Sequence, residues 1–233
     1  MVAPRIVARR LRVVSGIALA LALIGLAAWL FLLNWRPAER AFPVQGVDVS
    51  AAQGRIQWFA LKAAGARFAY ARATMGAAVR DDRFAANWQG MYEAEIPRGA
   101  IHIYSLCQLA SDQAANFVTT VPRRGAQLPA AIDLDFHRDC TARPDRQVVL
   151  TELQTLLRAT ESHLGKTPIL RISKRFEDRY RISEAFPNRL WAVGTFFPPD
   201  YLARGWTLWQ ANRFRHAKGV TGALNWNVIA PAP

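Results

Sequence analysis

Two acidic residues, Asp133 and Asp135, stand at the end of a short apolar run, Ala130-Ala131-Ile132-Asp133-Leu134-Asp135. Alternating apolar and polar residues are typical of a β-strand, and this alternation puts both carboxyl groups on one face. Their Cα atoms would lie about 6.6 Å apart at the usual rise of a strand. Two carboxyl groups on a partly buried face repel each other, so one tends to keep its proton. A protonated acid beside an ionised one can cleave a glycosidic bond, although such a pair also caps helices or binds arginines.

The sequence from Val44 onward alternates strand and helix patterns around this run. Strands are expected at residues 44–49, 67–73, 98–104, 130–135, 167–172, 189–193, 206–210 and 221–226. Helical patterns cover residues 56–64, 82–95, 111–121 and 145–164, and shorter ones cover 174–179 and 200–204. This order predicts an α/β fold, an irregular (β/α)₈-like barrel with eight strands and fewer helices in its second half.

Nearly every predicted strand ends on polar or aromatic residues, where an ordinary barrel core would carry Val, Ile or Leu. Chemistry in such barrels gathers at the C-terminal ends of the strands. The recurrence therefore predicts a site at that end, with Asp48, Asp133 and Asp135 as its acidic residues. The expected substrate-binding residues are Tyr70, Arg72, His102, Tyr104, Trp191, Trp209, Gln210 and Asn225. The alternatives are a buried structural role for His102, Trp191 and Trp209.

An uncharged run of mainly Leu, Ala, Ile and Val covers residues 13–33. As a helix it would span about 31 Å, close to the hydrocarbon thickness of a bilayer. Four arginines at residues 5–12 precede it, so the positive-inside rule places the N-terminus in the cytoplasm. A cleaved signal peptide is the alternative. We expect an uncleaved single-pass anchor in the cytoplasmic membrane, because residues 30–35 form a poor small-residue cleavage site.

These features predict four segments: a basic cytoplasmic N-terminus (residues 1–12), the transmembrane anchor (13–33), a linker (34–43) and an exported catalytic domain (44–233). The formal net charge is +13, of which the four arginines before the anchor carry +4, and the remaining +9 of the exported part suits an anionic polymer such as cell wall. A nucleic-acid partner is not expected, because the basic residues join no binding motif and the anchor puts the domain in the wrong compartment. We interpret the basic residues Arg123, Arg124, Arg171, Lys174 and Arg175 as solvated faces.

The chain has two cysteines, Cys107 and Cys140, each a few residues past a predicted strand. Export permits a disulfide between them, and two free buried thiols are the alternative. Neither cysteine has a second ligand at zinc spacing, so no metal site is expected. No cofactor is expected either.

Several motifs, in order and spacing, resemble glycoside hydrolase family 25, the Chalaropsis-type lysozymes or N-acetylmuramidases. The first of these motifs is Gly46-Val47-Asp48-Val49-Ser50. The next two are Phe68-Ala69-Tyr70-Ala71-Arg72-Ala73-Thr74 and Gly99-Ala100-Ile101-His102-Ile103-Tyr104. It closes with Trp209-Gln210 and Asn225-Trp226-Asn227. The resemblance covers about residues 44–229.

The resemblance implies hydrolysis of the β-1,4 bond between N-acetylmuramic acid and N-acetylglucosamine in peptidoglycan. It also implies a substrate-assisted mechanism, in which the substrate acetamido group attacks the anomeric carbon. By position, Asp48 is the first-strand acid, Asp133 orients the acetamido group, and Asp135 is the general acid and then the base.

The sequence departs from the family pattern at functional positions. Asp135 replaces the Glu of an Asp-x-Glu motif, and Met75, Arg72 and Asn225 replace a Glu, a Lys and an Asp. A donor about 1 Å too short can cost on the order of 10²-fold in rate. A catalytically weak or inactive peptidoglycan-binding relative is therefore the alternative function. A third reading is an assembly protein whose barrel is a structural module.

Overall fold

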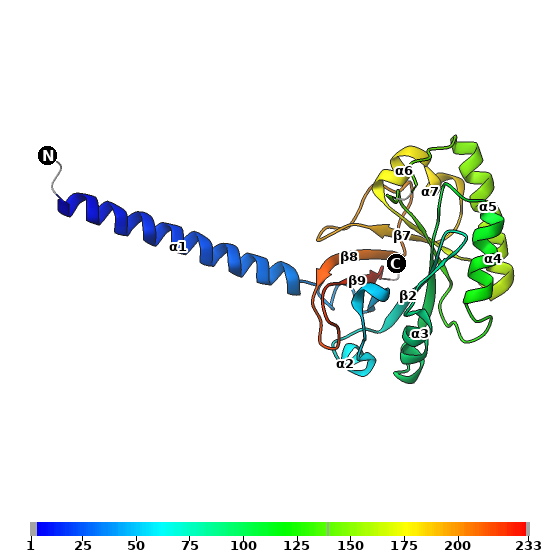
Figure 1. Ribbon diagram of the computed structural model, residues 1–233, viewed down its shortest axis with the longest axis horizontal. Helices are drawn as coiled ribbons and strands as arrows, with labels where there is room; N and C mark the ends of the chain where they lie inside the picture. Colours follow the sequence, from blue (N-terminus) through cyan, green and yellow to red (C-terminus); the bar gives the residue numbers. More distant parts are fainter. Residues whose placement is uncertain (1–3, 139, 232–233) are drawn as a thin grey trace. The chain divides into compact units, whose positions relative to one another are not determined.

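The structure, a computed structural model, describes residues 4–138 and 140–231, with side chains from residue 8 onward. The chain forms two compact units, Met1–Trp35 and Arg36–Pro233. In the first unit, helix α1 runs from Pro4 to Asn34 (Figure 1). Within the described residues, one stretch of helix, Ala8–Asn34, is long and apolar enough to cross a membrane. This stretch contains the predicted span, residues 13–33.

The second unit is a closed barrel. Its strands are β1 (Gln45–Val49), β2 (Phe68–Met75), β3 (Val79–Arg80), β4 (Arg98–Ile103), β5 (Ala131–Leu134), β6 (Ile169–Ile172), β7 (Leu190–Val193), β8 (Leu208–Arg215) and β9 (Leu224–Ile229). They follow the order β1-β9-β8-β7-β6-β5-β4-β2-β3, and β1 also pairs with β2, which closes eight of them into a barrel. The predicted eight-stranded α/β barrel is therefore confirmed.

Two features of the sheet were not predicted. The short strand β3 forms an antiparallel hairpin with β2, outside the ring. Strand β9 runs antiparallel to both of its neighbours, β1 and β8, whereas the other neighbouring pairs of the ring are parallel. The direct turn from β8 to β9 leaves no room for a crossover helix, which explains why helices thin out late in the chain.

The helices are α2 (Trp58–Ala63), α3 (Phe84–Glu93), α4 (Ala110–Thr120), α5 (Arg146–Leu164), α6 (Lys174–Tyr180) and α7 (Ile182–Ala185). Helix α5 ends where predicted, at Gly165, which adopts the left-handed conformation with φ 67°. The expected helix at 200–204 is wrong, because Tyr201 instead braces the strands: its hydroxyl donates to the carbonyl of Ile172 at 2.6 Å.

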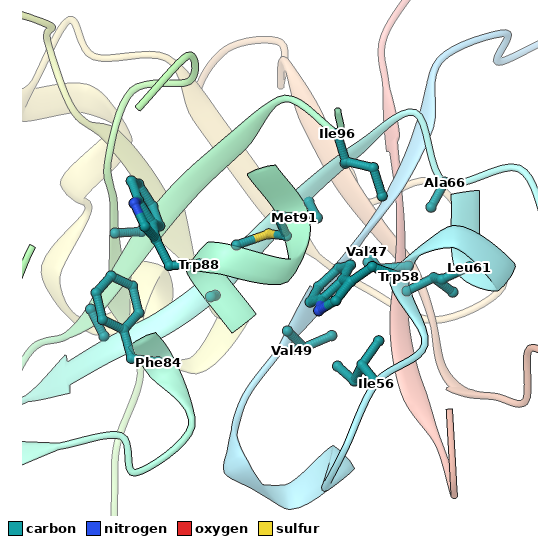
Figure 2. Close-up of a cluster of buried hydrophobic side chains, with 14 of the residues drawn as sticks. Val47, Val49, Ile56, Trp58, Leu61, Ala66, Phe84, Trp88, Met91 and Ile96 are labelled. Carbon is teal, nitrogen blue, oxygen red and sulfur yellow. The ribbon is translucent and has the colours of Figure 1, made fainter. Parts of the chain in front are cut away.

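Apolar side chains from α2 and α3 pack on the outer face of β1 (Figure 2). Trp58 and Met91 lie beside Val47 and Val49, the residues that flank Asp48. Gly90 of α3 allows this packing, since a Cβ there would come within 2.2 Å of Trp58. The packing fixes the strand that carries Asp48.

Candidate active site

A cavity of about 160 Å³ opens at the C-terminal ends of the strands. Its lining comes from six strands (β1, β2, β4, β5, β6 and β9) and the segment after β1, and comprises Asp48, Val49, Ser50, Gln53, Arg72, Ile101, Ile103, Asp133, Arg171 and Asn225. Two of the three predicted acids, Asp48 and Asp133, thus meet in one hollow that is more polar than the barrel interior beneath it.

Asp48 is buried at the end of β1, and both of its oxygens accept hydrogen bonds from β9. Asn225 donates its side-chain amide to Oδ1 at 2.8 Å, and Asn227 donates to Oδ2 at 2.8 Å. The pairing of Asp48 with Asn225 across the β1–β9 ladder brings these groups together. Burial raises the pKa of Asp48, although Arg171 and the two amides partly oppose this rise.

Asp133 forms an ion pair with Arg171, whose Nη1 lies 2.6 Å from Oδ1. The two residues are register partners in the parallel strands β5 and β6. Their side chains are 10% and 12% exposed, so the pair is largely withdrawn from water. Arg171 Nη2 also donates to the Oε1 atom of Gln210. The prediction that Arg171 belongs to a solvated face is wrong.

Asp135 lies just past the end of β5 and faces a different hollow. Its Oδ1 accepts from Ser173 Oγ at 2.6 Å, from the Phe136 amide at 2.8 Å and from Arg175 at 2.8 Å. Burial opposes ionisation of Asp135, but these three donors together hold its pKa below the ordinary value. The hollow beside it, which Tyr104 and His137 also line, measures about 10 Å³. That volume holds about one water molecule and no sugar ring.

Arg72 is the predicted binding residue that is most open to the cavity. Its Nε binds Asp81 at 2.9 Å, and its side chain is 36% exposed. Asp81 also accepts from the backbone amide of Ala51, which ties the loop after β1 to the end of β2. Arg72 and Asn225 therefore keep their predicted place in the lining of the cavity.

Four other predicted binding residues are buried, and their contact with substrate stays a prediction. Tyr70 and Trp191 pack against each other inside the barrel, with ring centroids 5.0 Å apart. Trp209 packs against Trp206 and Phe42. His102 is fully buried between Thr74 and Gln113, which satisfy its two ring nitrogens. Tyr70 and Trp191 fill the interior because a barrel of eight strands is solid inside, whereas His102 and Trp209 lie on the outer face of their strands.

Gln210 and Tyr104 are buried as well, and their contact with substrate stays a prediction. Gln210 supports Arg171. Tyr104 packs with residues of the second core, including Leu134 and Phe176.

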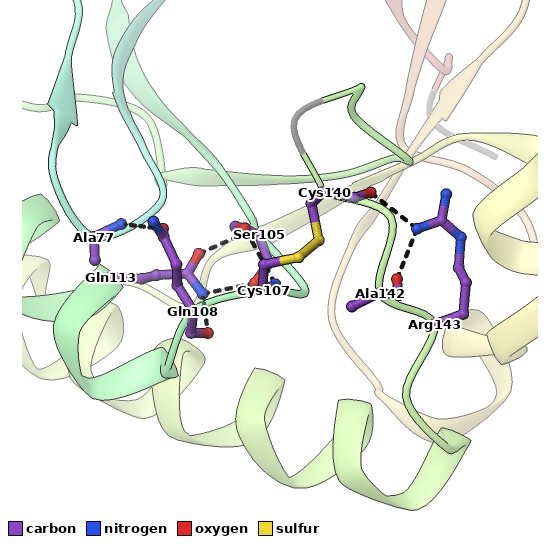
Figure 3. Close-up of a disulfide and its surroundings, with 8 residues drawn as sticks. All are labelled: Ala77, Ser105, Cys107, Gln108, Gln113, Cys140, Ala142 and Arg143. Atoms are coloured by element: carbon purple, nitrogen blue, oxygen red, sulfur yellow. Dashed lines mark hydrogen bonds between the residues drawn. A yellow bond between two sulfur atoms is a disulfide. The ribbon is translucent and has the colours of Figure 1, made fainter.

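The two cysteines form a disulfide, Cys107–Cys140, with Cα atoms 5.8 Å apart (Figure 3). It joins the loop after β4 to the loop that follows Asp135. Arg143 donates to the carbonyls of Cys140 and Ala142 in the same loop. Of the two alternatives left open by the sequence, the bridge is the correct one.

Sequence reasoning missed Arg171, Asn227 and Ser173. Their positions are the available signal, because β6 ends and the antiparallel strand β9 begins beside the predicted acids. Within the part of the chain that the structure describes, no group of three or more His, Cys, Asp or Glu residues is arranged to hold a metal ion.

The barrel and its acid-lined mouth define an enzyme of the glycoside hydrolase class. A sequence model for the Glycosyl hydrolases family 25 matches residues 47–220. The chain belongs to this family.

The chain is also similar to individual proteins. It is 54% identical over 214 residues to lysozyme M1 of Streptomyces globisporus, covering 79% of this chain and 67% of that protein. It is 30% identical over 196 residues to the uncharacterized protein YegX of Escherichia coli strain K12, covering 81% and 70%.

Two solved structures share the fold. A family 25 glycosyl hydrolase from Bacillus anthracis superposes with a TM-score of 0.76 at 30% identity, covering 85% of this chain and 94% of that one. A bacterial lysozyme from Streptomyces coelicolor superposes with a TM-score of 0.73 at 26% identity, covering 81% and 93%.

Proposed function

We propose that this protein is a membrane-anchored peptidoglycan hydrolase that cleaves the β-1,4 bond between N-acetylmuramic acid and N-acetylglucosamine. The observation that carries the proposal is the cavity at the mouth of a family 25 barrel, lined by Asp48, Asp133 and Arg171. The similarity to lysozyme M1 supports a wall glycan as the substrate.

In the proposed mechanism the substrate supplies the nucleophile. Its acetamido oxygen attacks the anomeric carbon while Asp133 accepts a hydrogen bond from the acetamido N–H. Asp135 lines the neighbouring hollow, so the mechanism requires its side chain to turn toward the cavity when the glycan binds. There it gives its proton to the leaving oxygen and then takes a proton from the water that opens the cyclic intermediate. Asp48 adds negative charge near the developing oxocarbenium centre.

A second candidate function is peptidoglycan binding with little or no turnover. The hydrogen bonds to Asp135 favour it, since a carboxylate held by three donors gives up its role as a proton donor. The same hydrogen bonds keep Asp135 ionised, which suits the second step of the reaction, where it acts as a base. The two candidates therefore differ in whether Asp135 can be protonated when the glycan binds.

The proposed location is the cytoplasmic membrane, with residues 1–12 cytoplasmic, 13–33 in the bilayer, 34–43 as a linker and 44–233 on the outer side. Helix α1 supports an anchor by its length and composition. A substrate in the cell wall requires the barrel to be exported. The membrane lipids and the glycan strands are then the expected partners.

The test uses the full chain in detergent micelles with purified peptidoglycan, followed by mass analysis of the released fragments. New reducing ends at N-acetylmuramic acid support the hydrolase, and Asp135→Asn should abolish them. Asp135→Glu should retain or raise the activity, because it restores the missing methylene. Wall binding without new ends would favour the binding protein, and no affinity for wall would reject both.

A further inference from the structure

Arg171 is a buried cation that is held from several sides. Its Nη1 binds Asp133 at 2.6 Å and its Nη2 donates to Gln210. Its guanidinium carbon lies 5.5 Å from the ring centre of Trp191, within range of a cation–π interaction. Trp191 is in turn fixed by a hydrogen bond from its Nε1 to Asn227. The guanidinium therefore has one defined orientation.

This cation lies among the three acids of the site. Burial alone would lower the pKa of Arg171, but the carboxylates of Asp133, Asp48 and Asp135 outweigh burial and raise it. Arg171 thus stays charged at every working pH. Removing a charge from such a cluster leaves the buried carboxylates uncompensated.

The ion pair also orients Asp133. Arg171 donates to Oδ1, and no other hydrogen bond to the Asp133 carboxylate is found among the described residues. Its second oxygen is therefore left for a ligand in the cavity that Asp133 lines. The planar guanidinium can contact Asp133 and Gln210 together, which the single ammonium group of a lysine does less well.

We propose that Arg171 is a positioning residue: it turns Asp133 so that one oxygen meets the substrate acetamido group, and it balances the charge of the three acids. Trp191 and Gln210 act through Arg171 and not through the sugar. This inference rests on the proposed function, because it assigns a partner to an acid of that mechanism.

The test compares Arg171→Met, Arg171→Lys and Gln210→Leu in the full chain in detergent micelles, acting on soluble glycan fragments. Arg67→Met is the matched control, because Arg67 is exposed just before β2, at the opposite end of the barrel. A misplaced Asp133 predicts a loss of about 10²-fold in kcat for Arg171→Met, with KM changed far less. The Gln210→Leu variant keeps the charge of Arg171, so its kcat should fall by less than that of Arg171→Met.

The pH profile separates positioning from mere structural support. Without the charge of Arg171 the pKa of Asp48 rises further, so the limb of the profile that reports Asp48 moves to higher pH in Arg171→Met. Arg171→Lys restores the positive charge, so the limb that reports Asp48 should return to its wild-type pH. Its kcat should recover only in part. A profile and kcat for Arg171→Met that match Arg67→Met would overturn the inference while leaving the proposed function intact.

A wild-type protein that releases no reducing ends defeats the proposed function instead. In that case the affinity for glycan fragments, measured by calorimetry against pH, tests Arg171. A pH dependence that shifts in Arg171→Met and returns in Arg171→Lys supports the inference. The same pH dependence of the affinity in the wild type, Arg171→Met and Arg171→Lys would contradict the inference.

Discussion

At Asp48 two influences act in opposite directions. Burial disfavours the carboxylate, whereas the amides of Asn225 and Asn227 and the charge of Arg171 stabilise it. The raised pKa shows that burial prevails. A buried acid with a raised pKa lowers the stability of the folded protein, and proteins tolerate such a loss at functional sites.

Replacing Asp48 by Asn should therefore stabilise the fold and abolish hydrolysis. Because the folded-state pKa is raised, the folded protein holds this proton to higher pH than the unfolded chain, and wild-type stability falls as pH rises above the ordinary carboxyl range. The gain in Tm for Asp48→Asn should thus be larger at pH 7 than at pH 4, as scanning calorimetry of the full chain would measure. The exposed Asp82→Asn is the control. A gain independent of pH would contradict the assignment.

Arg175 helps to hold Asp135 ionised, and its side chain is 65% exposed. Arg175→Met should raise the pKa of Asp135 and move the basic limb of the pH–rate profile to higher pH. Exposed ion pairs contribute at most about 1 kcal/mol, so the rate at pH 7 should rise by no more than about fivefold. Arg179→Met, on the same helix α6, should leave the profile unchanged. A lower rate in Arg175→Met would favour the binding protein.

At the scale of elements, the loops after β4 and β5 carry the least regular part of the site. Asp135 stands directly before residues 136–138 and 140–145, none of which belongs to a helix or strand. The Cys107–Cys140 bridge joins this segment to the loop after β4. The bridge thus supplies the restraint that secondary structure does not.

Exchanging both cysteines for serine should lower the stability by about 3 kcal/mol, the usual effect of closing a loop of this length. The sequence separation of the bridge is 33 residues. Thermal unfolding of the full chain measures the loss, and a reducing agent should reproduce it in the wild type. The double serine variant should not respond to the reducing agent. Equal Tm values for the two proteins would show that the bridge does not restrain the loop.

At the scale of the whole molecule, the barrel unit and the α1 unit are separate in the chain, and each has a distinct proposed task. Helix α1 has no acidic residue in its first turn and no basic residue in its last, so only its arginine-rich start gives it polarity. This arrangement fits an anchor that leaves the enzyme on the outer side.

Replacing Leu21 and Leu23 by Arg should release the protein from the membrane fraction, because each Arg at the centre of a span costs about 3 kcal/mol. Membrane fractionation with carbonate extraction measures the distribution. Intact mass of the wild type should include residues 1–33. A mass that lacks them would identify a cleaved signal peptide.

The sequence by itself determined the order of the eight barrel strands and of helices α2 to α6, the apolar run of α1, and the placement of Asp48 and Asp133 at strand ends. These are properties of local periodicity, which a short window of residues contains in full. The family motifs depend on the same strand ends, which is why fold and family could be predicted together.

Only the tertiary structure decided which strand-end residues reach the cavity and which fill the barrel. Tyr70 is the register partner of Asp48 on the neighbouring strand, yet its ring packs against Trp191 inside the barrel whereas Asp48 lines the cavity. Arg171 has the pattern of a surface arginine, yet its register partner is Asp133. The burial of a side chain and its partner on the neighbouring strand depend on segments far apart in the chain. A local sequence pattern therefore cannot predict them.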